Sequence, residues 1–258
     1  MIRSYINYLF RAGNEHSVHS PFVYDLYTKV IKPGQKKRTF FADIEALRRQ
    51  LRRSEEEIEV LDLGAGSRVN KSNRRKVRDI TRNAEKPARF GQFFYDLATY
   101  LAPKSILELG TSLGLTTAYF ARAVAEGEVV TMEGCPETAR IARDNFQKLG
   151  LNSVQIVVGN IDLTLPEVLK KPENEFELVF FDANHRYEPT LRYFATAKKY
   201  ASPKSVFIMD DIYWSEEMKQ AWEVIKADPD VTVTIDLFWI GLVFFRKEQR
   251  KENFILKF

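Results

Sequence analysis

The sequence lacks most of the features that mark secreted, membrane-spanning or cysteine-rich metal proteins. It has one cysteine, Cys135, among 258 residues, which excludes an internal disulfide and a multi-cysteine zinc site. No apolar run approaches the roughly 20 residues that a membrane helix needs. The N-terminal stretch carries Arg3 and Arg11 and has no long apolar core or small-residue cleavage site, unlike a secretory signal. A cytoplasmic location is therefore the default expectation.

What the sequence does contain is enough apolar material for a packed core. Hydrophobic residues make up 45% and charged residues 29% of the chain, a composition typical of globular proteins. The net charge of +4 is unevenly distributed: residues 1–90 hold 20 Lys and Arg against 11 Asp and Glu (+9), and the remaining residues hold 19 against 24 (−5). A basic segment can attract nucleic acid, an anionic membrane or an acidic small substrate. Alternatively, the charges from Arg48 to Glu59 form a solvated helix face of paired side chains.

From Ser105 onward, short apolar runs alternate with amphipathic stretches, which is the pattern of βαβ units around a parallel sheet. The runs are continuously apolar, as in strands buried on both faces. They cover residues 105–109, 128–132, 154–158, 177–181 and 205–209, with helices expected over 116–125, 136–149, 189–200 and 215–226. The β-rich runs 231–238 and 241–247 are separated by two residues, a gap that forces an antiparallel hairpin. We therefore predict an α/β fold, a Rossmann-like, doubly wound, seven-stranded sheet that is mostly parallel with a reversed C-terminal strand.

The first 90 residues lack this alternation and predict a basic, mainly helical N-terminal cap or extension, followed by a ligand-binding domain over residues 91–258. Helices are expected over 2–10, 22–30 and 40–51. The basic stretch from Arg68 to Arg89 is interpreted as a linker or a mobile lid, and 90–101 as a helix that leads into the first core strand.

The strongest motif joins the first core strand to the next helix, with the sequence LELGTSLGLTT over 107–117. Gly110 and Gly114 allow a tight turn and a close approach to a ligand, and the N-terminus of the following helix offers free N–H groups. The spacing G-x-x-x-G is neither the dinucleotide fingerprint nor a P-loop. A glycine-rich turn alone does not identify the ligand, because several nucleotide-binding folds use one. The residues that follow the other strands are therefore needed to identify it.

Acidic and polar residues follow the next strands at the same edge of the predicted sheet. Glu133 ends the second strand, where it could accept hydrogen bonds from two ribose hydroxyls. Asn160 and Asp162 follow the third strand, where they could contact an adenine edge, and Asp182 and His185 follow the fourth. Because open α/β sheets bind ligands at the carboxyl ends of their strands, the register of these residues indicates a ligand crevice.

These motifs together resemble the class I S-adenosylmethionine-dependent methyltransferases, and ILELGTSLGLTT is similar to the catechol and caffeoyl-CoA O-methyltransferase branch. The resemblance covers residues 105–247. It implies S-adenosylmethionine as cofactor. The implied contacts are Glu108, Gly110, Thr111, Ser112 and Gly114 around the methionine portion, Glu133 and Gly134 at the ribose, Asn160 and Asp162 at the adenine, and Asp182.

The same resemblance implies a divalent cation, Mg²⁺ or another, held by Asp182 and the pair Asp210 and Asp211. Three carboxylates would form a hard oxygen site, and the cation would lower the pKa of the hydroxyl to be methylated. Alternatively, Asp210 and Asp211 only cap the helix that starts near Ser215. His185 and Asp182 are the candidate bases; His185 stands where the animal catechol enzymes have a lysine.

A rival first motif, VLDLGAGS over 60–67, is followed by RVNKSNRRKVRD and not by an apolar helix. We therefore favour 105–117 for the cofactor and leave the Gly64–Asn70 loop as a candidate cover of the site. The leading function is O-methylation of a small hydroxylated acceptor. A nucleic-acid methyltransferase and a non-catalytic nucleoside-binding module remain alternatives. The acceptor, the need for a metal, the role of residues 1–90 and a homo-oligomeric state stay open.

Overall fold

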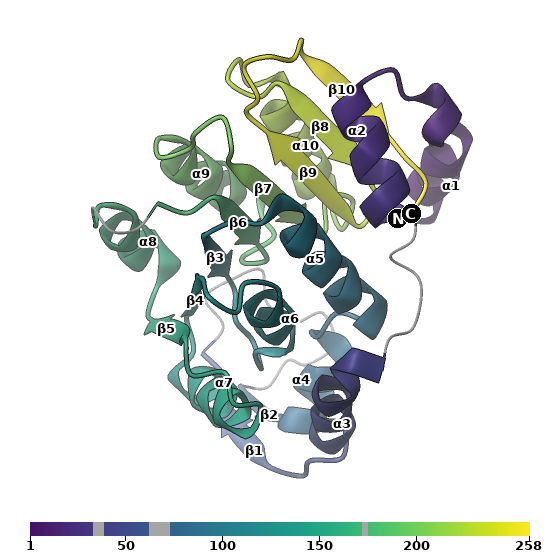
Figure 1. Cartoon of the computed structure of the whole chain (residues 1–258). Helices are drawn as coiled ribbons and strands as arrows, with labels where there is room; N and C mark the ends of the chain where they lie inside the picture. The colour runs from purple at the N-terminus through teal and green to yellow at the C-terminus, as the bar shows by residue number, and fades with distance from the viewer. Residues whose placement is uncertain (33–38, 62–72, 172–174) are drawn as a thin grey trace.

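The computed structural model of the chain describes residues 1–32, 39–61, 73–171 and 175–258. Within them, an eight-stranded sheet has the order β10-β8-β9-β7-β6-β3-β4-β5, with helices on both faces (Figure 1). Neighbouring strands are parallel except where β9 meets β7 and β8. The strands are β3 (Ser105–Leu109), β4 (Glu128–Glu133), β5 (Val154–Val158), β6 (Leu178–Phe181), β7 (Val206–Asp210), β8 (Val233–Asp236), β9 (Ile240–Phe244) and β10 (Glu252–Ile255).

The predicted α/β fold with one reversed strand is confirmed. The five core strands lie within one residue of the predicted ranges. Four of them, β3, β4, β6 and β7, are largely buried on both faces and therefore read as continuous apolar runs, whereas the edge strand β5 is only partly buried. The hairpin of β8 and β9 is antiparallel as expected. In the described residues the main sheet has eight strands rather than seven, since β10 adds a further strand that pairs parallel to β8. Its four residues follow a charged stretch and carry little signal of their own.

Helices cover the two faces of the sheet in separate groups. One core cluster joins the sheet to α2 (Pro21–Leu26), the π-helical turn η2 (Tyr27–Ile31), α5 (Ala88–Leu101) and α6 (Leu115–Ala123). The other joins the opposite face to α8 (Ile161–Leu169), α9 (Tyr187–Lys198) and α10 (Glu216–Ala227). Strand β3 lies at the point where the strand order reverses, between β4 and β6. Ligands of open α/β sheets bind at such a switch point, beyond the carboxyl ends of the strands.

The N-terminal residues pack against the rest of the chain in three places. Helix α2 and turn η2 lie on the sheet face described above. Helix α3 (Ala42–Leu51) and α4 (Val77–Asn83) share a cluster with α6 and with α7 (Pro136–Lys148). Helix α1 (Ile2–Arg11) sets Tyr5 and Tyr8 against the ring of Phe238, with centroids 4.8 and 5.4 Å away. Phe238 lies two residues beyond the end of β8, so α1 lies at the carboxyl end of that strand.

The interpretation of Arg68–Arg89 as a linker or lid is wrong for the part that the structure describes. Residues from Arg74 form the short strand β2 (Arg74–Lys76), which pairs antiparallel with β1 (Glu57–Glu59), and then α4. The rival motif largely lies outside the described residues, as does the Gly64–Asn70 loop. Of the described helices, none is long and apolar enough to cross a membrane.

Candidate functional site

The glycine-rich turn between β3 and α6 lies against the start of the loop that follows β6. Gly110 has φ +100°, and a Cβ built on it would stand 2.2 Å from the carbonyl oxygen of Asp182. Gly114 has φ +80°, and its Cβ would meet the ring of Phe146 at 2.5 Å. Ser112 is also left-handed at φ 50°. The turn therefore has a shape that side chains at positions 110 and 114 would not allow.

Glu133, at the end of β4, is tied to this turn. Its two carboxylate oxygens accept backbone hydrogen bonds from Ser112 and from Cys135, each at 2.9 Å. Burial raises the pKa of Glu133, and the backbone N–H donors act in the opposite direction. The residue expected to bind the ribose thus sits beside the residues expected to bind the methionine portion, while Thr111 turns inward and bonds Thr131 at 2.7 Å.

Glu108 is fully buried, with a relative exposure of 0%. Its Oε2 accepts hydrogen bonds from the hydroxyls of Thr117 and, at 2.7 Å, Thr131. Its Oε1 has no hydrogen-bond partner among the described residues. Burial raises the pKa of Glu108 to about 8. The carboxylate is buried between β3 and α6. Its contact with a cofactor stays a prediction.

We expect Glu108→Gln to weaken the pH dependence of folding stability. The folded state holds the Glu108 proton more tightly than the unfolded state between the ordinary pKa of 4.5 and about 8, so its contribution falls as pH rises through this window, by at most about 1.4 kcal/mol per pH unit. Urea unfolding at several pH values from 5 to 8 measures the slope. Glu137→Gln, at an exposed position on α7, is the control; equal slopes in the two variants would contradict the assignment.

Asn160 and Asp162, predicted at the adenine, are both engaged at the start of α8. The Asn160 side chain caps this helix by accepting from the backbone N–H of Asp162 at 2.9 Å. The Asp162 carboxylate accepts from Arg192 on α9 at 2.7 and 2.9 Å. Their role at an adenine stays a prediction. For Asp162 to contact an adenine, its carboxylate would have to leave Arg192 or bind Arg192 and the adenine together.

Asp182 and His185 form an acid–imidazole pair beyond the end of β6. His185 Nε2 lies 3.3 Å from Asp182 Oδ1, and both Asn184 and His185 adopt positive φ angles, 71° and 43°. Burial alone would raise the pKa of Asp182, but the bond with His185 and the charge of Lys86 hold it below its usual value. The tight turn therefore directs the imidazole back onto the carboxylate.

The pair Asp210–Asp211, at the end of β7, faces a lysine that the sequence interpretation missed. Lys86 Nζ lies 2.6 Å from Asp210 Oδ2 and donates a hydrogen bond to Asp211 Oδ1 at 3.0 Å. The two aspartates do not cap α10, because the hydroxyl of Ser215 accepts from Met218 N–H in that role. Asp182, His185 and Asp210 each offer a potential metal ligand atom within 4.8 Å of one another.

Glu85, next to Lys86, contacts the glycine-rich turn. Its Oε1 accepts from the backbone N–H of Leu113 at 2.9 Å, and burial raises its pKa. Residues 85 and 86 thus reach two parts of the site from the segment between α4 and α5. No residue of this segment was among the sequence candidates, because one acid and one lysine in a basic stretch have no distinctive pattern.

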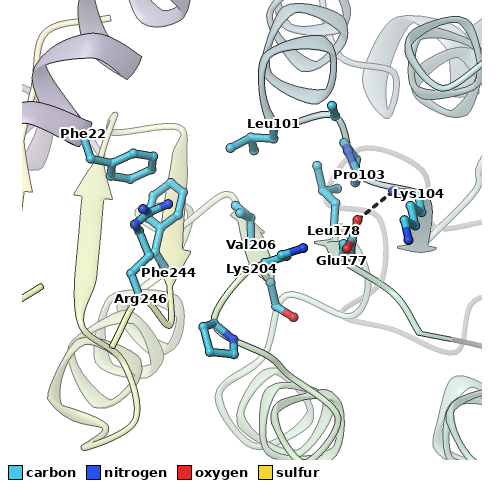
Figure 2. A pocket seen from close by; sticks show the side chains of 13 residues that line it. Phe22, Leu101, Pro103, Lys104, Glu177, Leu178, Lys204, Val206, Phe244 and Arg246 are labelled. Atoms are coloured by element: carbon cyan, nitrogen blue, oxygen red, sulfur yellow. Dashed lines mark hydrogen bonds between the residues drawn. The ribbon is translucent and has the colours of Figure 1, made fainter. Parts of the chain in front are cut away.

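A cavity of about 310 Å³ opens at the opposite, amino-terminal edge of the strands. Figure 2 shows its wall, where Lys104 donates its backbone N–H to Glu177 Oε2 at 2.8 Å. The guanidinium of Arg246 stacks 4.3 Å from the ring centre of Phe22. None of the sequence-predicted site residues lines this cavity, so it is separate from the candidate site.

Comparison with known proteins agrees with this arrangement. Residues 107–212 match the family model of a methyltransferase domain. The catechol O-methyltransferases of Niastella koreensis and Mycobacterium tuberculosis are 34% and 35% identical over 124 and 127 residues, which cover 47% and 48% of this chain and 55% and 56% of the relatives. The chain thus spans about half the length of these relatives.

The fold is also that of a solved O-methyltransferase from Bacillus cereus in complex with SAH. The two structures have a TM-score of 0.58 and 22% sequence identity, and the match covers 81% of this chain and 92% of the other. It therefore extends beyond the domain itself into part of the N-terminal segment.

Proposed function

We propose that the protein transfers a methyl group from S-adenosylmethionine to a hydroxyl oxygen of a small acceptor. The observation that carries the proposal is the contact between Gly110 and Asp182. It brings the turn expected to hold the cofactor against the residue expected to take a proton from the acceptor. The names of the catechol O-methyltransferase relatives support the same activity.

The residues around the turn suit this cofactor. When bound, S-adenosylmethionine supplies a sulfonium-activated methyl group. Glu133 anchors the ribose side: each of its oxygens takes one backbone N–H and keeps a lone pair for a ribose hydroxyl. The positive φ angles of Gly110 and Gly114 keep side chains out of the turn, so backbone groups can approach the methionine portion.

Asp182 and His185 would handle the proton. The acceptor hydroxyl gives its proton to this pair, and the freed oxygen bonds to the methyl carbon while the carbon–sulfur bond breaks, its electrons staying on sulfur. A carboxylate 3.3 Å from the imidazole stabilises the protonated ring and orients it. The overall change produces a methyl ether, a neutral thioether and one proton.

Glu133→Ala should weaken the binding of S-adenosylhomocysteine at least tenfold. The variant removes two hydrogen bonds to ribose hydroxyls, each worth about 1 kcal/mol, and frees the N–H groups of Ser112 and Cys135. Calorimetric titration measures the affinity. Glu137→Ala, four residues along on the exposed side of α7, should bind normally; unchanged affinity in Glu133→Ala would remove Glu133 from the site.

The direct test of the proposed function is methyl transfer from labelled S-adenosylmethionine to a panel of phenols and catechols. Transfer to an oxygen, identified by mass spectrometry, supports it. Tight binding of S-adenosylhomocysteine with no transfer to any acceptor would favour the non-catalytic module instead. Several basic groups of the N-terminal segment are paired within the protein, including Arg48 with Glu45 and Lys76 with Glu55, so we do not favour a nucleic-acid substrate.

A divalent cation at Asp182, Asp210 and Asp211 is the remaining sequence prediction for this site. Ligand atoms of Asp182, His185 and Asp210 are close enough together to bind one. However, the Lys86 ammonium contacts Asp210 and Asp211, so two of the three predicted ligands already have a cationic partner. The donor set does not fit an open oxygen site, and the proposed reaction uses no metal ion.

A further inference from the structure

Lys86 is held at the acceptor side of the site by its neighbours. Its backbone carbonyl accepts a hydrogen bond from Arg48 Nη1 at 2.7 Å. The preceding residue, Glu85, is bonded to the N–H of Leu113, and the following Pro87 begins α5 as its N-cap. The side chain of Lys86 is 14% exposed and that of Asp210 1% exposed. Lys86 is therefore a fixed part of the interior and not a surface lysine that happens to reach an acid.

The charges around Lys86 match those that a divalent ion would meet. The Lys86 ammonium lies 2.6 Å from Asp210 Oδ2 and 3.0 Å from Asp211 Oδ1, and Asp182 offers a ligand atom within 4.8 Å of one on Asp210. Three carboxylates so close repel one another unless a cation or a proton separates them. The ammonium is that cation.

We propose that Lys86 is the built-in cation of this cluster, which takes the place of a divalent metal ion and binds the acceptor oxygen. An ammonium has three N–H bonds. One donates to Asp211, the charge forms an ion pair with Asp210, and a remaining N–H would donate to the acceptor. The positive charge lowers the pKa of the bound hydroxyl, so Asp182 and His185 can remove its proton more easily. Only the catalytic part of this inference rests on the proposed methyl transfer; the metal-binding part does not.

The metal-binding part is tested with Mn²⁺ alone, in the presence of S-adenosylhomocysteine, by electron paramagnetic resonance of the free ion. The wild-type chain should bind no Mn²⁺ at the cluster below about 1 mM. Lys86→Met keeps an unbranched side chain that is one atom shorter and removes its charge, so the carboxylates left without a cation should bind Mn²⁺ at least tenfold more tightly. Adding Asp210→Asn to Lys86→Met should abolish this gain.

Two binding results would overturn the proposal. One is a wild-type Mn²⁺ site in the micromolar range that Asp210→Asn removes. The other is equal Mn²⁺ affinity in the wild type and Lys86→Met, because the lysine would then not occupy the ion's place. If Lys86→Met fails to show a cooperative thermal transition, the wild-type titration still decides between the lysine and a metal.

The catalytic part is tested by turnover on an acceptor that the wild type methylates. Activity should be insensitive to EDTA, and Lys86→Met should lower kcat/KM about 100-fold while S-adenosylhomocysteine affinity changes less than twofold. Lys86→Ala should be partly rescued by added ethylammonium, an effect that a purely structural role would not produce. Lys29→Met, which removes an exposed lysine paired with Asp25, is the control.

Loss of activity in EDTA that Mg²⁺ restores, or full activity in Lys86→Met, would overturn the proposal. A wild type with no methyl transfer at all would instead refute the proposed function, and the Mn²⁺ titrations would still report on Lys86. The two failures are therefore distinguishable.

Discussion

Gly110→Val should prevent the main sheet from folding normally, with a loss of about 3 kcal/mol or more in the free energy of unfolding. Two costs combine at this position. The backbone has φ +100°, and a Cβ would lie 2.2 Å from the carbonyl oxygen of Asp182, a backbone atom that cannot rotate away. Since Asp182 N–H donates to Leu109 O at 2.9 Å, moving it would break the pairing of β3 with β6. Denaturant unfolding followed by circular dichroism measures the loss.

Gly150→Ala is the matched control. Gly150 also has a positive φ, +67°, but nothing lies within 4 Å of its Cβ position, so its replacement should cost only the strain of a left-handed residue, about 1 kcal/mol. A Gly110→Val protein as stable as this control, but unable to bind S-adenosylhomocysteine, would show that the glycine serves the ligand alone. Gly64→Val, outside the described residues, should leave cofactor binding largely intact.

Most strands of the sheet were predictable because they are buried on both faces. The run SILEL is fully buried and became β3 with the predicted bounds. The run VQIVV became β5 with the predicted bounds as well, although it lies at the edge of the sheet and is only partly buried. Helix α8 was not predicted, because its first residues were interpreted as a ligand loop and Pro166 interrupts its pattern. Strand β10 forms by pairing with β8, and the sequence of its own four residues does not indicate a strand.

The acids of the site were predictable because they follow strands. Asp182, His185 and Asp210 lie together since β6 and β7 are neighbouring parallel strands whose carboxyl ends meet at one edge. The sequence did not predict that Lys86, from the segment between α4 and α5, would contact Asp210 and Asp211. No local pattern distinguishes Lys86 from the other basic residues of the first 90.

Topology, rather than motif, was the signal that could have indicated Lys86. Helix α5 ends at Leu101, four residues before β3 begins at Ser105, so the helix runs back along the strand. Its 14 residues rise about 21 Å, slightly more than the length of β3, and the residues just before it must therefore lie near the carboxyl edge. A charged residue just before such a helix is therefore as good a candidate for the site as one that follows a strand.

Asp182→Ala and His185→Ala should each lower kcat by about 10²- to 10⁴-fold, the usual contribution of a positioned general base. The structure joins the two residues into one unit, with His185 Nε2 3.3 Å from Asp182 Oδ1. The double variant should therefore lose little more than the more impaired single variant, because residues that act as a unit are not additive. Rapid-quench measurement of a single turnover on a methylated acceptor gives the chemical step directly.

The control for this pair is His19→Ala. His19 is exposed, and its replacement should leave kcat unchanged. Losses in the two single variants that multiply in the double variant would mean that Asp182 and His185 act separately, one on the acceptor and the other on the cofactor. Full activity in Asp182→Ala together with a large loss in His185→Ala would show that the imidazole is the sole base. The reverse result would show that the Asp182 carboxylate is the sole base. Only the non-additive result supports proton transfer to the pair that the turn of Asn184 and His185 brings together.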